Sequence, residues 1–483
     1  MKLLGPTLLI LGAILNILAL FMLIPLALSI AYDSDNQIAF FSSATITSVV
    51  GIIFLLIGKK SRLDFMQPRQ VFLITSVAWA GVSLFSALPF ILIDHPLTIA
   101  DAVFEAVSGV TSTGSSVMAG LDHFPKDVLL WRSLLNWIGG VGIIGMAIAV
   151  LPFLRVGGMR LFKTESSDWS DKAMPRARSL MAMIIYCYIT LSLICGCAYW
   201  LAGMDVFNAV NHAMATVSTG GFSTSDASFA QFDSLILHWI AIIFMLAGAF
   251  PFVLFVRMLI NRRFIVLEDT QVRGLLLIVV VMTLLLTVQL IIADKMDPFR
   301  ALTMACFNLV SIVTTTGFAS GDYQQWGPIA FVVFYFAMFV GGCSGSTSGG
   351  IKVFRLQIFA GLVKEQIITA IHPRAIISRR YNGRLISSEI IASSISYMCL
   401  MAACLVLITV ILAFTGLDLI TSVSGAATAV MNVGPGLGDV IGPAGNFSSL
   451  SDTAKWALSA GMLLGRLEFL TILVLFTPAF WRA

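Results

Sequence analysis

Long apolar runs recur along almost the whole of this 483-residue chain, and no other feature restricts its fold as strongly. Each run has about 20 residues, the length that an α-helix needs to cross the hydrocarbon core of a membrane. Only 11% of the residues are charged, against roughly 25% in an ordinary soluble domain. The sequence therefore predicts an all-α polytopic membrane protein and excludes a soluble enzyme with one anchor.

The apolar runs predict ten membrane spans. They cover residues 3–30, 38–58, 70–93, 128–154, 178–202, 232–260, 273–293, 328–363, 388–414 and 453–479. We expect the first run to be a retained transmembrane helix, because it is about as long as a full span and no small-residue cleavage site precedes a soluble domain.

Basic residues are distributed unevenly between the two sides of these spans. If the N-terminus is cytoplasmic, the inside connections and ends hold 23 of the 29 Lys and Arg residues, and five, including Arg132 and Lys455, lie outside. This bias predicts that both termini are cytoplasmic. The formal net charge of +4 is too small to indicate a nucleic-acid partner. Most of the seven cysteines fall in apolar runs, which favours buried thiols over a disulfide framework.

Four short semi-apolar segments lie in the outside connections of the last eight spans, and each is too short to cross. Their sequences are EAVSGVTSTGSS (105–116), NHAMATVSTGGFS (211–223), FNLVSIVTTTGFA (307–319) and SGAATAVMNVGPG (424–436). Aligned on a shared glycine, each has a small residue six positions earlier, namely Ser108, Ala215, Ser311 or Thr428. An acid precedes each segment, namely Asp101, Asp205, Asp297 or Asp418. Ordinary surface loops are the alternative, but four equivalent copies favour a re-entrant loop.

Re-entrant loops of this kind suit a cation pore. Irregular backbone at membrane depth is tolerated only where protein buries it or water lines it. Carbonyl oxygens from four converging loops can replace the hydration shell of a cation, and glycine allows the φ > 0 that such a turn needs. The predicted filter residues are Ser112, Thr113 and Gly114 in the first loop, Thr219, Gly220 and Gly221 in the second, Thr315, Thr316 and Gly317 in the third, and Asn432, Val433 and Gly434 in the fourth.

These motifs resemble the TrkH/KtrB/HKT superfamily of potassium transporters, most closely its bacterial TrkH family, over nearly the whole chain. The matching segments are STGGFST (218–224), TTTGF (314–318), NVGPG (432–436) and GGCSGSTSGGIKV (341–353). The resemblance implies potassium as the transported ion, no organic cofactor, a homodimer in the bacterial inner membrane, and a cytoplasmic TrkA-type nucleotide-binding ring as gating partner. The first loop matches less closely, but it keeps glycine where some sodium-selective plant relatives have serine.

The resemblance also implies an architecture. Two additional N-terminal helices (residues 1–65) precede four helix/pore-loop/helix repeats around one pore with pseudo-fourfold symmetry. The repeats cover residues 66–160, 161–265, 266–375 and 376–483.

The eighth predicted span is interrupted by residues 341–350, of which five are glycine and three are serine. Glycine costs about 1 kcal/mol relative to alanine in a helix, so we expect a break. A kinked structural helix is the alternative, but the resemblance favours an intramembrane gate made of Gly345, Ser346, Thr347, Ser348 and Gly349.

Arg466 lies within the last predicted span, where a cation is expensive and is a functional candidate by default. We expect it to lie just below the filter, where it repels cations or binds carbonyls of the 341–350 loop. Glu468 would lie on a different face of a continuous helix and is not an obvious partner. A snorkelling or purely structural arginine is the alternative.

Three other functions compete with a potassium channel-like pore. A sodium- or proton-coupled secondary potassium transporter of the KtrB type lacks the two additional N-terminal helices. A secondary transporter with broken helices usually shows paired acids or inverted repeats within its spans. An intramembrane enzyme needs a catalytic arrangement such as Ser/His within helices, and none is visible among the five histidines. The sequence therefore predicts a transporter and not an enzyme.

Overall fold

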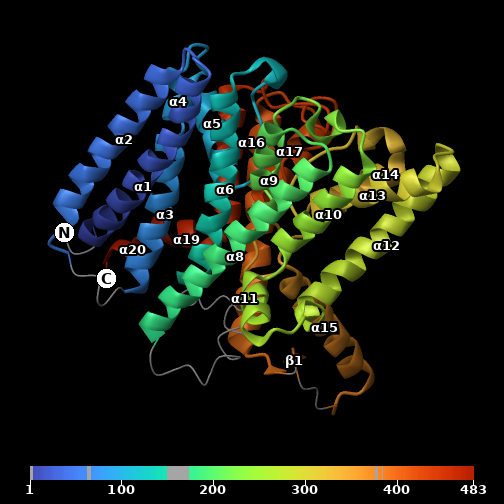
Figure 1. Cartoon of the computed structure of the whole chain (residues 1–483). Coiled ribbons are helices and arrows are strands. Elements are labelled where there is room, and N and C mark those ends of the chain that lie inside the picture. Colours follow the sequence, from blue (N-terminus) through green and yellow to red (C-terminus); the bar gives the residue numbers. More distant parts are fainter. Residues whose placement is uncertain (1–3, 62–66, 150–172, 376–378, 383, 483) are drawn as a thin grey trace.

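The computed structural model describes residues 4–61, 67–149, 173–375, 379–382 and 384–482, and these are mostly helical (Figure 1). Within these ranges, seven helices are long and apolar enough to cross a membrane, or up to nine if each of two sharply bent pairs counts as one span. Strands β1 (Arg380–Tyr381) and β2 (Arg384–Leu385) form a short two-stranded antiparallel sheet. The all-α polytopic fold is confirmed.

The first two helices form a hairpin at one side of the molecule (Figure 1). Helix α1 (Leu4–Ala31) packs along α2 (Gln37–Gly58) and against α3 (Pro68–Ser86) and α6 (Lys126–Ala149). A Cβ atom added to Gly12 would lie 2.6 Å from the carbonyl oxygen of Gly51. Small residues thus let the two backbones approach closely, as is common between membrane helices.

The remaining helices follow as long spans, short helices and half-spans. They are α4 (Leu88–Leu92), α5 (Ile99–Val110), α8 (Ala173–Leu201), α9 (Val206–Val217), α10 (Leu235–Ala249), α11 (Phe252–Asn261), α12 (Thr270–Ala293), α13 (Pro298–Val313), α14 (Pro328–Ala337), α15 (Val353–Ile371), α16 (Ser388–Phe414), α17 (Leu419–Met431), α18 (Asp452–Arg466), α19 (Leu470–Leu473) and α20 (Pro478–Arg482).

The long helices keep large apolar faces on the outside of the molecule. Only 28% of the most apolar window of α2 and of α16, and 33% of that of α12, is buried inside the protein. The exposed remainder includes Leu277, Leu284 and Ile292 of α12. Apolar faces of this size require lipid rather than water. All seven cysteines are free thiols, and Cys197 and Cys399 are exposed on such faces instead of buried as we expected.

Four short helices, α5, α9, α13 and α17, precede the four predicted filter segments. The Asp205, Asp297 and Asp418 side chains cap α9, α13 and α17 by accepting hydrogen bonds from backbone N–H groups. Thr98 caps α5, and Asp101 lies in its first turn. Hydrogen bonds from Thr421 lower the pKa of Asp418, so this cap is a carboxylate at neutral pH.

These short helices pack across the boundaries between predicted repeats. Helix α9 contacts α6 of the first repeat, α13 contacts α10 of the second, and α5 contacts α18 of the fourth. Each contact joins the short helix of one repeat to the preceding repeat in cyclic order. Three of the four short helices are therefore packed against the helix that follows the filter segment of another predicted repeat.

Three predicted spans are broken, and only one of these breaks was expected. The eighth span divides into α14 and α15 around residues 338–352. The sixth bends by 92° between α10 and α11, where Pro251 makes Phe250 extended. The last bends by 104° between α18 and α19, where Glu468 and Phe469 adopt φ of 59° and 54°. The predicted spans 232–260 and 453–479 each correspond to a sharply bent pair of helices and not to one straight helix.

Some predicted boundaries fall outside the described residues. The end of the fourth span at residues 150–154 and the repeat boundary after residue 160 lie in the undescribed segment 150–172. The boundaries after residues 65 and 375 lie beside or within the undescribed segments 62–66 and 376–378.

Candidate functional site

The four predicted filter segments share one backbone conformation. In each, the residue two positions before the glycine is left-handed, with φ of 51° at Ser112, 51° at Thr219, 57° at Thr315 and 56° at Asn432. The glycines also have positive φ, namely 90° at Gly114, 71° at Gly221, 87° at Gly317 and 113° at Gly434. Two left-handed residues so close together produce a tight turn directly after each short helix.

The small residue six positions before each glycine closes this turn. In the first loop, the Thr113 amide donates to the carbonyl of Ser108 over 2.8 Å. The equivalent bonds in the other loops are Gly220 N to Ala215 O (2.9 Å), Thr316 N to Ser311 O (2.8 Å) and Val433 N to Thr428 O (3.0 Å). In all four loops, the carbonyl of the small residue therefore accepts the same hydrogen bond.

The four loops meet in a closed ring. A Cβ atom added to any of the four glycines would lie under 3.0 Å from the carbonyl oxygen that precedes the glycine of the next loop. The contacts run from Gly114 to Gly220 O, from Gly221 to Thr316 O, from Gly317 to Val433 O and from Gly434 to Thr113 O. Close approach and positive φ both require glycine here. The ring follows chain order and closes the fourth loop on the first.

The twelve predicted filter residues offer only backbone and neutral side-chain groups. Gly114 and Gly317 are partly exposed, and the other ten residues are buried. Rings of backbone carbonyls are a known way to bind a dehydrated monovalent cation. The negative ends of α5, α9, α13 and α17 adjoin the same ring, since each filter segment follows directly on one of these helices.

The predicted gate residues lie directly against three of the loops. Thr347 Oγ1 donates to the carbonyls of Val217 (3.1 Å) and Gly248 (3.0 Å) and accepts from Thr219 Oγ1 (3.1 Å). The Gly349 amide donates to Thr315 Oγ1 over 2.6 Å. The irregular segment is therefore joined to the second and third loops.

The 341–350 segment also contacts the fourth loop and the unexpected break in the sixth span. The Gly350 amide donates to Met431 O over 2.8 Å, at the end of α17. The Cys343 amide donates to Ala249 O over 2.9 Å, and Gly345 O accepts from the Phe252 amide over 3.0 Å. The break between α10 and α11 frees the groups that bind the segment, which gives a physical reason for a bend that hydropathy did not indicate.

Arg466 contacts the same segment. Its side chain is 3% exposed, and Nη2 donates to Thr347 O over 2.7 Å. The other residues predicted for the gate, Ser346 and Ser348, are also buried, and Gly345 has a φ of 77°. The Arg466 side chain therefore contacts a backbone carbonyl of the 341–350 segment.

Two charged residues that the sequence analysis did not select lie beside the segment. Arg355 of α15 is 1% exposed and donates through Nη2 to Glu468 Oε2 over 2.6 Å. Its guanidinium lies 3.7 Å from the centre of the Tyr397 ring. Lys352 donates to Ser348 O. The sequence did contain a signal for both residues. Lys352 belongs to the GGIKV segment that matches the family, and Arg355 is a charged residue within the predicted span 328–363.

Two basic residues that we assigned to the outside connections are buried. Arg132 of α6 is 1% exposed and is paired with Glu105, and Lys455 of α18 is 4% exposed and is paired with Asp101 over 2.6 Å. Both lie at the level of the short helices. The sequence analysis placed both residues on the outer side, and the structure shows in addition that both are buried members of ion pairs.

Comparison with known proteins identifies the family. The family model for TrkH, described as a cation transport protein, matches residues 37–483. The chain belongs to the TrkH family. Members of this family are transporters and not enzymes. The chain is 44% identical to the Trk system potassium uptake protein TrkI of Halomonas elongata, over 99% of this chain and 97% of that protein.

Other TrkH family members match over similar lengths. The Trk system potassium uptake protein TrkH of Escherichia coli K12 is 34% identical, over 95% of this chain and 96% of that protein. The crystal structure of the potassium transporter TrkH from Vibrio parahaemolyticus superposes with a TM-score of 0.92 at 31% identity, covering 100% of both chains. The fold described above is therefore the TrkH fold.

Proposed function

We propose that this chain takes up potassium ions across the bacterial inner membrane through a pore whose selectivity filter is the closed ring of four loops, arranged with pseudo-fourfold symmetry. The proposal rests above all on that ring, in which every filter glycine meets the carbonyl of the next loop. Relatives that match the whole chain are potassium uptake proteins, which supports potassium as the ion.

The physical basis of selection is the replacement of water by fixed oxygens. Carbonyls of the four loops coordinate a monovalent cation that has lost its hydration shell. The tight turns hold these oxygens, and the C-terminal ends of four short helices add negative potential. Potassium is the transported ion and is not a resident cofactor.

The gate in this proposal is the segment Gly345–Gly349 together with Arg466. The segment crosses the path below the ring, and the buried guanidinium repels a cation that leaves the filter. The hydrogen bond from Arg466 to Thr347 O supports this assignment, because it ties the charge to the segment.

We further propose that the protein is a homodimer with both termini in the cytoplasm. The excess of basic residues on that side supports the orientation. A cytoplasmic TrkA-type nucleotide-binding ring completes the proposal as gating partner, and α15 with the β1–β2 hairpin projects on the side where it would bind (Figure 1). The family resemblance supports both partners.

Uptake of radioactive rubidium into liposomes that hold the purified protein tests the function. We expect K⁺ to compete with rubidium far better than Na⁺. Replacement of Gly114, Gly221, Gly317 or Gly434 with serine forces a Cβ against a carbonyl and is expected to lower flux or selectivity by about tenfold or more. Equal competition by both ions, or four serine variants with normal selectivity, would contradict the proposal.

A further inference from the structure

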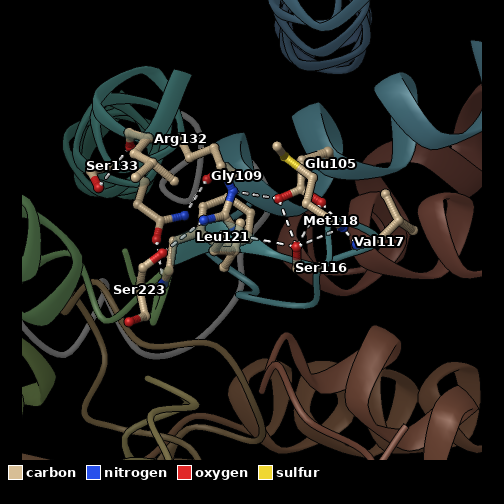
Figure 2. Close-up of polar contacts among 12 residues, drawn as sticks. Glu105, Gly109, Ser116, Val117, Met118, Leu121, Arg132, Ser133 and Ser223 are labelled. Carbon is tan, nitrogen blue, oxygen red and sulfur yellow. Dashed lines mark hydrogen bonds and ion pairs between the residues drawn. The ribbon is translucent and has the colours of Figure 1, made fainter. Parts of the chain in front are cut away.

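A buried ion pair lies behind the first two loops of the ring (Figure 2). Arg132 of α6 and Glu105 of α5 are 1% and 0% exposed. Arg132 Nε donates to Glu105 Oε1 over 2.7 Å. Neither residue belongs to the predicted filter or gate, so the pair has no role in the function proposed above.

The guanidinium of Arg132 joins equivalent positions of two neighbouring loops. Its Nη1 donates to Ser223 O over 2.7 Å, and its Nη2 donates to Ser116 Oγ over 3.1 Å. Ser116 and Ser223 each stand two residues after a filter glycine. The guanidinium also lies 4.2 Å from the centre of the Phe222 ring. One side chain therefore fixes the first loop relative to the second.

The carboxylate of Glu105 holds the first loop from behind. It accepts hydrogen bonds from Ser116 Oγ over 3.0 and 3.1 Å and from the Val117 amide over 2.9 Å. No buried polar atom of Glu105 or Arg132 lacks a partner. A buried ion pair is tolerable only when its remaining hydrogen-bonding groups are satisfied in this way.

The first loop lacks the aromatic ring that follows the glycine in the second and third loops. Phe222 and Phe318 follow the glycines of the second and third loops, where both rings are buried, but Ser115 follows Gly114. Two other contacts between neighbouring loops use neutral groups: the Ala319 amide donates to Ser228 Oγ, and the Phe447 amide donates to Ser116 O. The ion pair thus lies behind one of the two loops that have no aromatic ring after the glycine, the fourth loop having Pro435 at that position.

We propose that Glu105 and Arg132 are positioning residues for ion selection, which hold the first and second loops at the separation that potassium requires without contacting the ion. This inference rests on the proposed filter function. Lysine in place of Arg132 keeps the charge but cannot reach three acceptors in a fork, and glutamine in place of Glu105 leaves the guanidinium without its counter-charge.

Rubidium uptake competed by K⁺ and by Na⁺ tests the pair in liposomes that hold the full chain. In Glu105→Gln and Arg132→Lys we expect the discrimination between K⁺ and Na⁺ to fall by about fivefold or more, the effect of losing one net hydrogen bond at the filter. Ser116→Ala removes one bridging hydroxyl with little change in volume and is expected to cause a smaller loss. If the variants of the two charged residues fail to fold, the discrimination measured for Ser116→Ala tests the inference.

Asp101→Asn is the matched control. Asp101 lies on α5, as Glu105 does, but it pairs with Lys455 of α18 and does not contact the residues that follow a filter glycine. We expect it to keep normal discrimination. Normal discrimination in the pair variants at wild-type membrane levels, or an equal loss in Asp101→Asn, would overturn the inference. Gly114→Ser separates the two proposals: if it alters selectivity while the pair variants do not, only the pair inference fails, and if nothing alters selectivity, the filter proposal fails too.

Discussion

At the residue scale, the contact between Arg466 and Thr347 O is the most direct test of the gate. A hydrogen bond from a charged group contributes roughly 1.5–3 kcal/mol, so its loss shifts a closed-to-open equilibrium by about tenfold or more. We therefore expect Arg466→Ala to raise rubidium flux strongly. Uptake in liposomes measures this, and unchanged or lower flux in a well-folded variant would contradict the gate.

The same segment can be displaced without removing a charge. A Cβ at Gly349 would lie under 3.0 Å from Met431 O, whereas a Cβ at Gly361 of α15 meets nothing within 4 Å. Gly349→Ala should therefore raise flux in the same assay, and Gly361→Ala should not. If both alanine variants have the same rubidium flux, the packing of the 341–350 segment against the fourth loop does not control ion permeation.

At the element scale, a helix break could be predicted only where the local sequence disfavours a helix. The break at 341–350 was visible because glycine is costly in a helix. The break after Arg466 was not, because no glycine or proline occupies residues 467–469. The left-handed Glu468 and Phe469 are held instead by tertiary contacts, among them the bond from Arg355 to Glu468. Contacts between residues more than 100 positions apart leave no signal in local composition.

The ion pair between Arg355 and Glu468 leads to a prediction about how the helices are held together. It ties α15, which follows the gating segment, to the bend between α18 and α19. Glu468→Gln removes the counter-charge of a buried guanidinium, so we expect a lower melting temperature and a moderate rise in flux. Glu365→Gln breaks the more exposed pair with Arg379 and should change neither. Equal melting temperatures of both variants and the wild type would argue against this role.

At the scale of the whole molecule, the sequence predicted the kinds of parts better than their arrangement. Hydropathy predicted the membrane class, and the four aligned glycines predicted four equivalent turns. The contact of each loop with its neighbour depends on packing between distant helices, and periodicity within one segment carries no information about it. The buried positions of Arg132 and Lys455 were missed for the same reason.

The orientation of the molecule is testable by labelling. Asp33 lies in the connection between α1 and α2, and Leu385 is 71% exposed in β2. In cells, we expect cysteine at position 33 to react with a membrane-impermeant maleimide from outside, and cysteine at position 385 to react only after permeabilisation. Protein without an added cysteine controls for Cys197 and Cys399. The reverse pattern would contradict cytoplasmic termini.

The closure of the fourth loop on the first has a consequence for biosynthesis. The first and fourth loops are in contact, and Ser115 Oγ donates a hydrogen bond to Gly434 O although the two residues are 319 positions apart in the chain. A ribosome therefore completes nearly the whole polypeptide before the ring can exist. Arg466 emerges after all four loops, so the residue that we place at the gate enters the bilayer with the last helices to be inserted. A nascent chain that stalls earlier has an incomplete ring and no finished pore to leak ions.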